Sequence, residues 1–132
     1  MKPVNQKIIS ATDGDCFDAC MVSILELSDF PKWERRSSQY ELWNEYLEKF
    51  NMQVVYYSLG SFPLPYGYSI LSVRSALFAN ARHAVVFQSD GWTGQIIHNP
   101  NPEDPRGIEI PNEHWFGVSV VSVIDPSKFI GG

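Results

Sequence analysis

The chain has 132 residues, of which 44% are hydrophobic and 14% aromatic. This length is enough for one packed domain and too short for two ordinary ones, so we expect a single domain over residues 1–132. The formal net charge of -5 and the absence of a basic cluster longer than Arg35-Arg36 argue against a nucleic-acid partner. Because no apolar leader and no long apolar run occur, the sequence predicts a soluble, cytoplasmic protein with no membrane partner.

Two helices are expected in the first part of the chain. Apolar side chains recur at helical spacing over residues 16–27. Four residues before this segment favour a helix start by capping or by a tight turn, namely Thr12, Asp13, Gly14 and Asp15. Ser37 or Ser38 can cap a second helix, whose apolar face would carry Tyr40, Trp43, Tyr46, Leu47 and Phe50.

Strands are expected in the second part, where β-branched and aromatic runs begin. They predict five strands, at residues 53–57, 68–73, 83–87, 95–98 and 117–124. Residues 89–94 have turn chemistry and would join the third and fourth strands as an antiparallel hairpin, with His83 and His98 toward the same end. Helices first and strands afterwards predict an α+β fold with N-terminal helices packed on an antiparallel sheet.

Cys16 is the most informative single residue. It lies in the first turn of the predicted helix, where the helix dipole and unpaired N–H groups favour a reactive thiolate. Cys20 lies one turn further on in the apolar stripe and is interpreted as a core thiol. A disulfide between two such residues is sterically awkward, which fits a reducing compartment.

A thiolate nucleophile also needs a base, a group that orients the base, and a donor for the oxyanion. One residue is available for each role. His83 opens a hydrophobic strand, Asn99 begins the Pro-rich loop after the next strand, and Gln6 carries an amide donor upstream of Cys16.

These residues carry a resemblance to a known family. Gln6, the segments Gly14-Asp15-Cys16 and Arg82-His83-Ala84, and His98-Asn99-Pro100 resemble papain-like cysteine peptidases, and more narrowly small phage and bacterial proteins related to C39-like peptidases. The resemblance spans residues 6–102. It implies a papain-like fold and a cysteine hydrolase that cleaves an amide or isopeptide-type bond of a peptide or protein substrate without a cofactor.

The same resemblance assigns the roles. Cys16 would be the nucleophile, His83 the general base, Asn99 the orienting residue and Gln6 an oxyanion donor. Small members of the group often have Asp where this chain has Asn99, so the orienting group here would be a neutral amide. No oligomeric state is specified by the pattern.

Other interpretations stay open at this stage. A transglutaminase-like acyl transferase would use the same thioester, and a phage or bacterial binding protein could keep the fold without catalysis. Four residues, Cys16, Cys20, His83 and His98, would make a metal-ligand set, but their spacing argues against one.

Four further residues have a structural interpretation beside a functional one. Asp15 and Trp92 are the candidates for substrate contact, although a helix cap explains Asp15 better and packing explains Trp92 better. His98 is expected on the strand face opposite Asn99, with a structural role. His114 is expected to be a solvated residue in the turn before the last strand.

Overall fold

The computed structural model describes residues 1–9, 15–31, 39–60 and 64–123. Two helices, α1 (Cys16–Leu25) and α2 (Gln39–Glu48), precede five strands. The strands are β1 (Met52–Ser58), β2 (Gly67–Arg74), β3 (Arg82–Ser89), β4 (Gly94–His98) and β5 (Trp115–Val123), and a short 3-10 turn, η1 (Asn112–His114), leads into β5. The predicted order of elements and the five strands are confirmed. The expected caps at Thr12, Asp13, Gly14, Ser37 and Ser38 lie outside the described residues.

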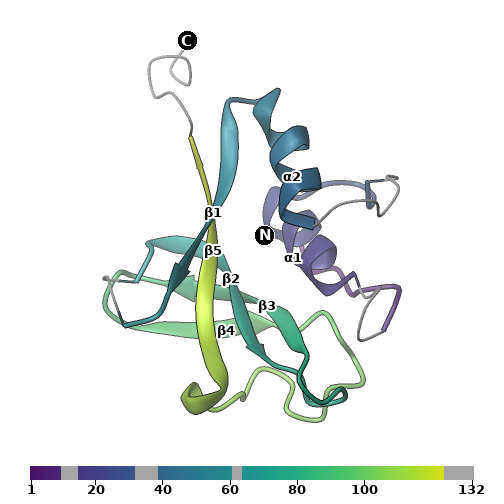
Figure 1. The fold of residues 1–132 in the computed structure, drawn as a ribbon, viewed down its shortest axis with the longest axis vertical. Helices are drawn as coiled ribbons and strands as arrows, with labels where there is room; N and C mark the ends of the chain where they lie inside the picture. The colour runs from purple at the N-terminus through teal and green to yellow at the C-terminus, as the bar shows by residue number, and fades with distance from the viewer. Residues whose placement is uncertain (10–14, 32–38, 61–63, 124–132) are drawn as a thin grey trace.

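The sheet has the order β1-β5-β2-β3-β4, and every neighbouring pair is antiparallel. The strand that is last in sequence, β5, therefore lies between β1 and β2 (Figure 1). The predicted hairpin of β3 and β4 is confirmed, and Gln88 pairs with Gln95 in its register. The order of strands brings β1, which follows the helices directly, to one edge of the sheet.

Hydrophobic residues fill both faces of the sheet. On one face, Met21 of α1 and Trp43 of α2 pack with Val86 of β3, and all three are fully buried. Val85 and Phe87 alternate with Val86 and form a second cluster on the opposite face. Each such buried side chain contributes about 1.5–3 kcal/mol, so this packing fixes α1 against β3 and places the start of α1 beside the start of β3.

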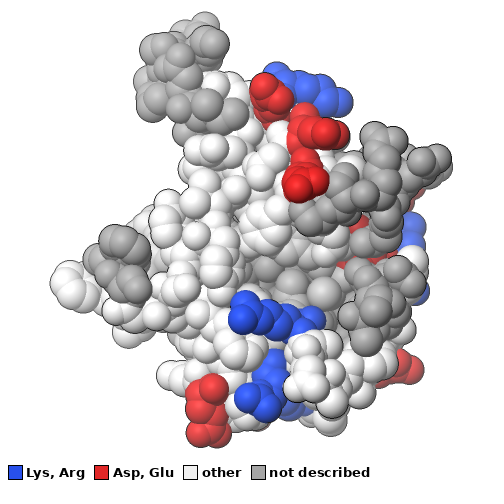
Figure 2. All heavy atoms as spheres, in the orientation of Figure 1, with Lys and Arg blue, Asp and Glu red and all other residues white. Residues whose placement is uncertain are grey.

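The helices are shorter than their apolar patterns. Residue Glu26 adopts a left-handed conformation with φ 55° and its N–H bonds the carbonyl of Val22, which ends α1 before the predicted end at residue 27. Phe50, predicted on the apolar face of the second helix, lies beyond α2 and is 54% exposed. Acidic side chains gather over α2 (Figure 2). Among the described helices, none combines the length and the apolar character that crossing a bilayer requires.

Candidate active site

Cys16 is the first residue of α1, as predicted, and it is half-buried. Burial raises the pKa of its thiol, while hydrogen bonds from the backbone N–H groups of Ala84 and Phe17 oppose this only in part. The predicted lowering of the Cys16 pKa is therefore wrong for the unliganded site, because desolvation outweighs the N–H groups at the helix start. The bond from Ala84 also ties the sulfur to β3, next to His83.

Cys20 is fully buried in the core cluster, and burial raises its pKa well above the ordinary value. Its interpretation as a core thiol is confirmed. Both cysteines are free thiols.

His83 and Asn99 form a hydrogen bond whose direction can be assigned. The His83 Nε2 atom lies 2.7 Å from the Asn99 Oδ1 atom. The Asn99 Nδ2 group donates to Asp104 Oδ2 at 3.0 Å and to the Gly107 carbonyl at 2.9 Å, and its Oδ1 accepts the Asn101 N–H at 3.1 Å. With the amide held in this orientation, Oδ1 must be the acceptor and His83 Nε2 must carry a proton.

This assignment leaves the other ring nitrogen of His83, Nδ1, as the basic one when the ring is neutral. The ring is buried, and burial lowers its pKa despite the opposing effects of Asn99 and Asp104. A neutral imidazole therefore predominates at neutral pH. Together with the raised pKa of Cys16, this describes a resting pair of neutral thiol and neutral base.

Asp104 and Arg106 extend the hydrogen-bonded chain behind Asn99, and sequence reasoning missed both. Arg106 donates to Asp104 through Nε at 3.0 Å and Nη2 at 2.8 Å. Burial would raise the pKa of the Asp104 carboxyl, but hydrogen bonds from Arg106 and Asn99 outweigh it and hold that pKa at about 2. The ionised carboxylate thus fixes the Asn99 amide. The sequence offered one indication of this ion pair, which is that Asp104 and Arg106 are two positions apart in a Pro-rich loop.

Cys16 and His83 line one hollow of about 350 Å³, which we call the cysteine hollow. Its other described lining residues are Phe17, Gln39, Tyr40, Tyr56, Ile70, Ser72, Arg82, Ala84 and Ser119. In the part of the chain that the structure describes, no hydrogen bond joins the Cys16 sulfur to the His83 ring. The two residues therefore line the same hollow without a hydrogen bond between them.

Two tyrosines, Tyr40 and Tyr56, also line the cysteine hollow. The Tyr40 hydroxyl is hydrogen-bonded to the Ser119 hydroxyl, which joins α2 to β5. Tyr56 of β1 extends over Gly117 of β5, where a Cβ atom would overlap the Tyr56 ring and nearby backbone. Gly117 thus provides the room that brings the Tyr56 side chain to the hollow.

Gln6 and Asp15 have contacts that differ from their predicted roles. The Gln6 Nε2 group donates to the Ile8 carbonyl at 2.8 Å, and Gln6 does not line the cysteine hollow. Asp15 is the N-cap residue of α1, as predicted, and its carbonyl accepts the Ala19 N–H at 2.9 Å, but its side chain makes no capping bond. Its buried carboxylate instead accepts the N–H groups of Lys7 at 3.0 Å and Ile8 at 2.9 Å. Asp15 therefore anchors the N-terminal segment beside α1, where it is unavailable for substrate contact.

The other two histidines do not line the cysteine hollow. His98 Nε2 bonds the Val4 carbonyl at 2.8 Å, in line with its predicted structural role. His114 lies in η1, but it is half-buried and its Nδ1 atom is buried without a partner, so the expected solvated side chain is wrong. Across the described ranges, no group of three or more His, Cys, Asp or Glu side chains is arranged to hold a metal ion.

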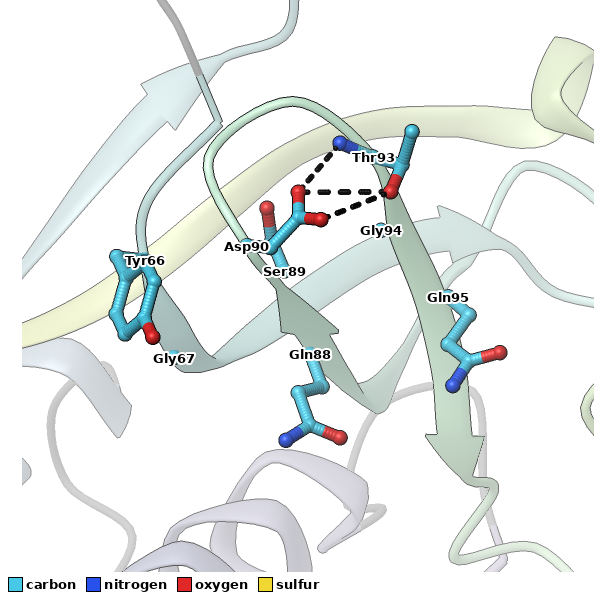
Figure 3. Close-up of a pocket in the computed structure, with 8 residues that line it drawn as sticks. All are labelled: Tyr66, Gly67, Gln88, Ser89, Asp90, Thr93, Gly94 and Gln95. Carbon is cyan, nitrogen blue, oxygen red and sulfur yellow. Dashed lines mark hydrogen bonds between the residues drawn. The ribbon is translucent and has the colours of Figure 1, made fainter.

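A larger hollow of about 540 Å³ lies at the far end of β3 (Figure 3). Its carboxylate, Asp90, accepts the N–H groups of Trp92 and Thr93 at 2.9 Å and so is used within the hairpin turn. Ser89 Oγ accepts the Gly91 N–H, and no described lining residue of this hollow is Cys or His. Trp92 itself is 91% exposed, so its expected packing is wrong. Of these two hollows, the smaller is the one that described cysteine and histidine residues line.

The chain matches no model of a known protein family, and no curated protein or solved structure is similar to it.

Proposed function

We propose that this protein is a cysteine hydrolase that cleaves an amide or isopeptide-type bond, with a papain-like arrangement of Cys16, His83 and Asn99. The observation that carries the proposal is the hydrogen bond from His83 Nε2 to Asn99, which leaves Nδ1 as the base in the hollow that Cys16 also lines. The free thiols fit a reducing compartment such as the cytoplasm.

The reaction would begin with a neutral pair. His83 Nδ1 takes the thiol proton as the Cys16 sulfur attacks the substrate carbonyl, and His83 then passes this proton to the leaving amine. Water hydrolyses the resulting thioester and regenerates the thiol. Asn99 Oδ1 accepts a hydrogen bond from His83 Nε2–H throughout, and the Asn99 amide is itself held by Asp104. The arrangement is one of general-base catalysis rather than a preformed thiolate–imidazolium pair, because burial raises the pKa of Cys16 and lowers that of His83.

The oxyanion would be stabilised by backbone N–H groups at the start of α1, where the Phe17 N–H also hydrogen-bonds the Cys16 sulfur. Gln6 is not assigned this role, because its amide donates to Ile8.

Selective alkylation tests the proposal before any substrate is known. Iodoacetamide should modify Cys16 and spare the fully buried Cys20, and mass mapping of the folded protein shows which thiol reacts. Replacement His83→Gln should slow modification of Cys16 near neutral pH and leave the rate unchanged at high pH, where the thiol ionises without a base. Equal, slow labelling of both thiols, or a rate at Cys16 that is independent of His83, would contradict the proposal and favour a binding protein without catalysis.

A further inference from the structure

Two arginines lie side by side next to the cysteine hollow. Arg74 is the last residue of β2, Arg82 is the first residue of β3, and the two are directly paired across the strands. Directly opposed residues of an antiparallel pair project on the same face, and like charges in this position destabilise the pairing. Both side chains are exposed, and no described carboxylate forms an ion pair with either. We refer to them as the arginine pair.

Arg82 is held in place by its surroundings. Its guanidinium lies over the Phe116 ring, 4.3 Å from the ring centroid, and Nη1 lies 3.5 Å from the Tyr56 hydroxyl. The Tyr56 hydroxyl is the one described hydrogen-bond partner of this exposed guanidinium, and a planar fork with further N–H groups to donate suits a carboxylate. A cation oriented in this way requires less ordering when an anion binds.

The arginine pair also joins two hollows. Arg82 lines the cysteine hollow and a second hollow of about 550 Å³, which we call the loop hollow. The loop hollow is lined by Arg74, by the β2–β3 connection at residues 75–81, and by Phe116. Since Arg82 lines both hollows, they adjoin at this side chain.

The charge of these hollows is opposite to that of the whole protein. The chain has 15 acidic residues and a net charge of -5, yet no described lining residue of either hollow is Asp or Glu. Figure 2 shows basic side chains gathered low on the middle of the face, away from the acidic ones over α2. Under physiological conditions salt largely screens charges that are more than about 8 Å apart. The sign of the charges close to the hollows therefore decides which ligands bind here.

We propose that the cysteine hollow and the loop hollow form one groove that binds a peptide with acidic side chains beside the scissile amide, their carboxylates lying on Arg74 and Arg82. This inference rests on the proposed hydrolase function and adds the substrate class to it. A bound carboxylate would also relieve the repulsion within the arginine pair, which offers a reason for placing two like charges opposite each other.

A pair of reagents that differ in one charge tests the inference. Iodoacetate and iodoacetamide both alkylate thiols with loss of iodide, but only iodoacetate is an anion at neutral pH. The ratio of their rate constants at Cys16, measured by mass spectrometry at low salt, should fall about fivefold in Arg82→Gln, the effect expected of one unit charge near the reagent in water. Arg82→Lys, which keeps the charge, should retain most of the ratio.

Lys49→Gln is the matched control. Lys49 also lies over an aromatic ring, 5.1 Å from the centroid of Tyr46, and its loss changes the net charge equally. It follows the end of α2, whereas Gln39 at the start of α2 lines the cysteine hollow, so it is about 15 Å away along the helix. The rate ratio should be unchanged in this variant.

Short peptides test the whole groove. An acetylated Glu-Ala-Glu amide should slow iodoacetamide labelling of Cys16 more than the Gln-Ala-Gln analogue, and Arg74→Gln should reduce that difference. Unchanged rate ratios in Arg82→Gln, or equal protection by the two peptides, would overturn the acidic-substrate inference while selective labelling of Cys16 still supported the hydrolase. If neither reagent modified Cys16 faster than Cys20 in the wild type, both proposals would be withdrawn.

Discussion

Replacing Asn99 by Asp is the most informative perturbation, because Asp is the residue that the sequence resemblance leads us to expect at this position. Here the Asn99 Nδ2 group faces two acceptors, the Asp104 carboxylate at 3.0 Å and the Gly107 carbonyl at 2.9 Å. In Asn99→Asp, an oxygen would take the place of Nδ2 and two carboxylates would meet. The acceptor for His83 would survive, but the support behind it would be lost.

The expected loss in the free energy of unfolding follows from the repulsion between the two carboxylates. Two carboxylates about 4 Å apart repel by about 4 kcal/mol at an effective dielectric constant near 20. Keeping one of them protonated at pH 7 costs a similar amount, about 4 kcal/mol from an ordinary Asp pKa near 3.9. We therefore expect Asn99→Asp to lower the free energy of unfolding by about 4 kcal/mol at pH 7, a loss that shrinks to about 1.5 kcal/mol at pH 5.

The sign of this pH effect follows from the raised pKa of the shared carboxyl pair. The folded variant binds a proton that the unfolded chain releases near pH 4. Below that pH the carboxyl pair therefore costs no stability, because one carboxyl is protonated in both states. The free energy of unfolding then falls as the pH rises through the folded pKa of the pair. Urea unfolding of wild type and variant at pH 5 and pH 7 measures the difference. Equal stability at pH 7 would refute the assignment of the Asn99 amide.

A double-mutant cycle separates this effect from general damage to the loop. Asp104→Asn alone should destabilise the protein, since Arg106 and Asn99 both lose their carboxylate acceptor. The double variant Asn99→Asp with Asp104→Asn restores a donor opposite a carboxylate, so its loss should be smaller than the sum of the single losses by about 2 kcal/mol. Simple additivity would show that the two side chains are not coupled.

Three further outcomes are expected. The free energy of unfolding of the wild type should fall with acid in two pH ranges. The first lies below about pH 6.5, because the folded pKa of His83 lies below its unfolded value, and the second runs from about pH 4 toward the Asp104 pKa of about 2. Urea unfolding at a series of pH values measures both losses, and His83→Gln should remove only the first. Asp15→Ala should cost about 2–3 kcal/mol in the same assay, because it leaves two N–H groups of the N-terminal segment without acceptors, and a loss below 0.5 kcal/mol would contradict its anchoring role. Gln6→Ala should leave the rate at which an activated ester acylates Cys16 unchanged, since the Gln6 amide is bonded to Ile8; this reaction passes through an oxyanion, so a tenfold slower rate would return Gln6 to the site.

Local patterns were enough to predict the elements of this fold. The helical recurrence after residue 16 and the alternating runs from Met52 onward specify helices and strands through the immediate neighbours of each residue, and turn residues between β3 and β4 specify a hairpin in the same way. Cys16 could be placed at a helix start for the same reason. A nucleophile, a base and an orienting residue could therefore be proposed in advance.

The tertiary structure decided what surrounds those residues. Burial of Cys16 against Ala84 of β3 raises a pKa that the helix start alone would lower, because desolvation depends on contacts between distant segments. The carboxylate that holds the Asn99 amide comes from Asp104, and only the folded loop brings the two side chains together. The pairing of Arg74 with Arg82, eight residues apart in the chain, arises only when β2 and β3 form a ladder, and no local pattern contains it.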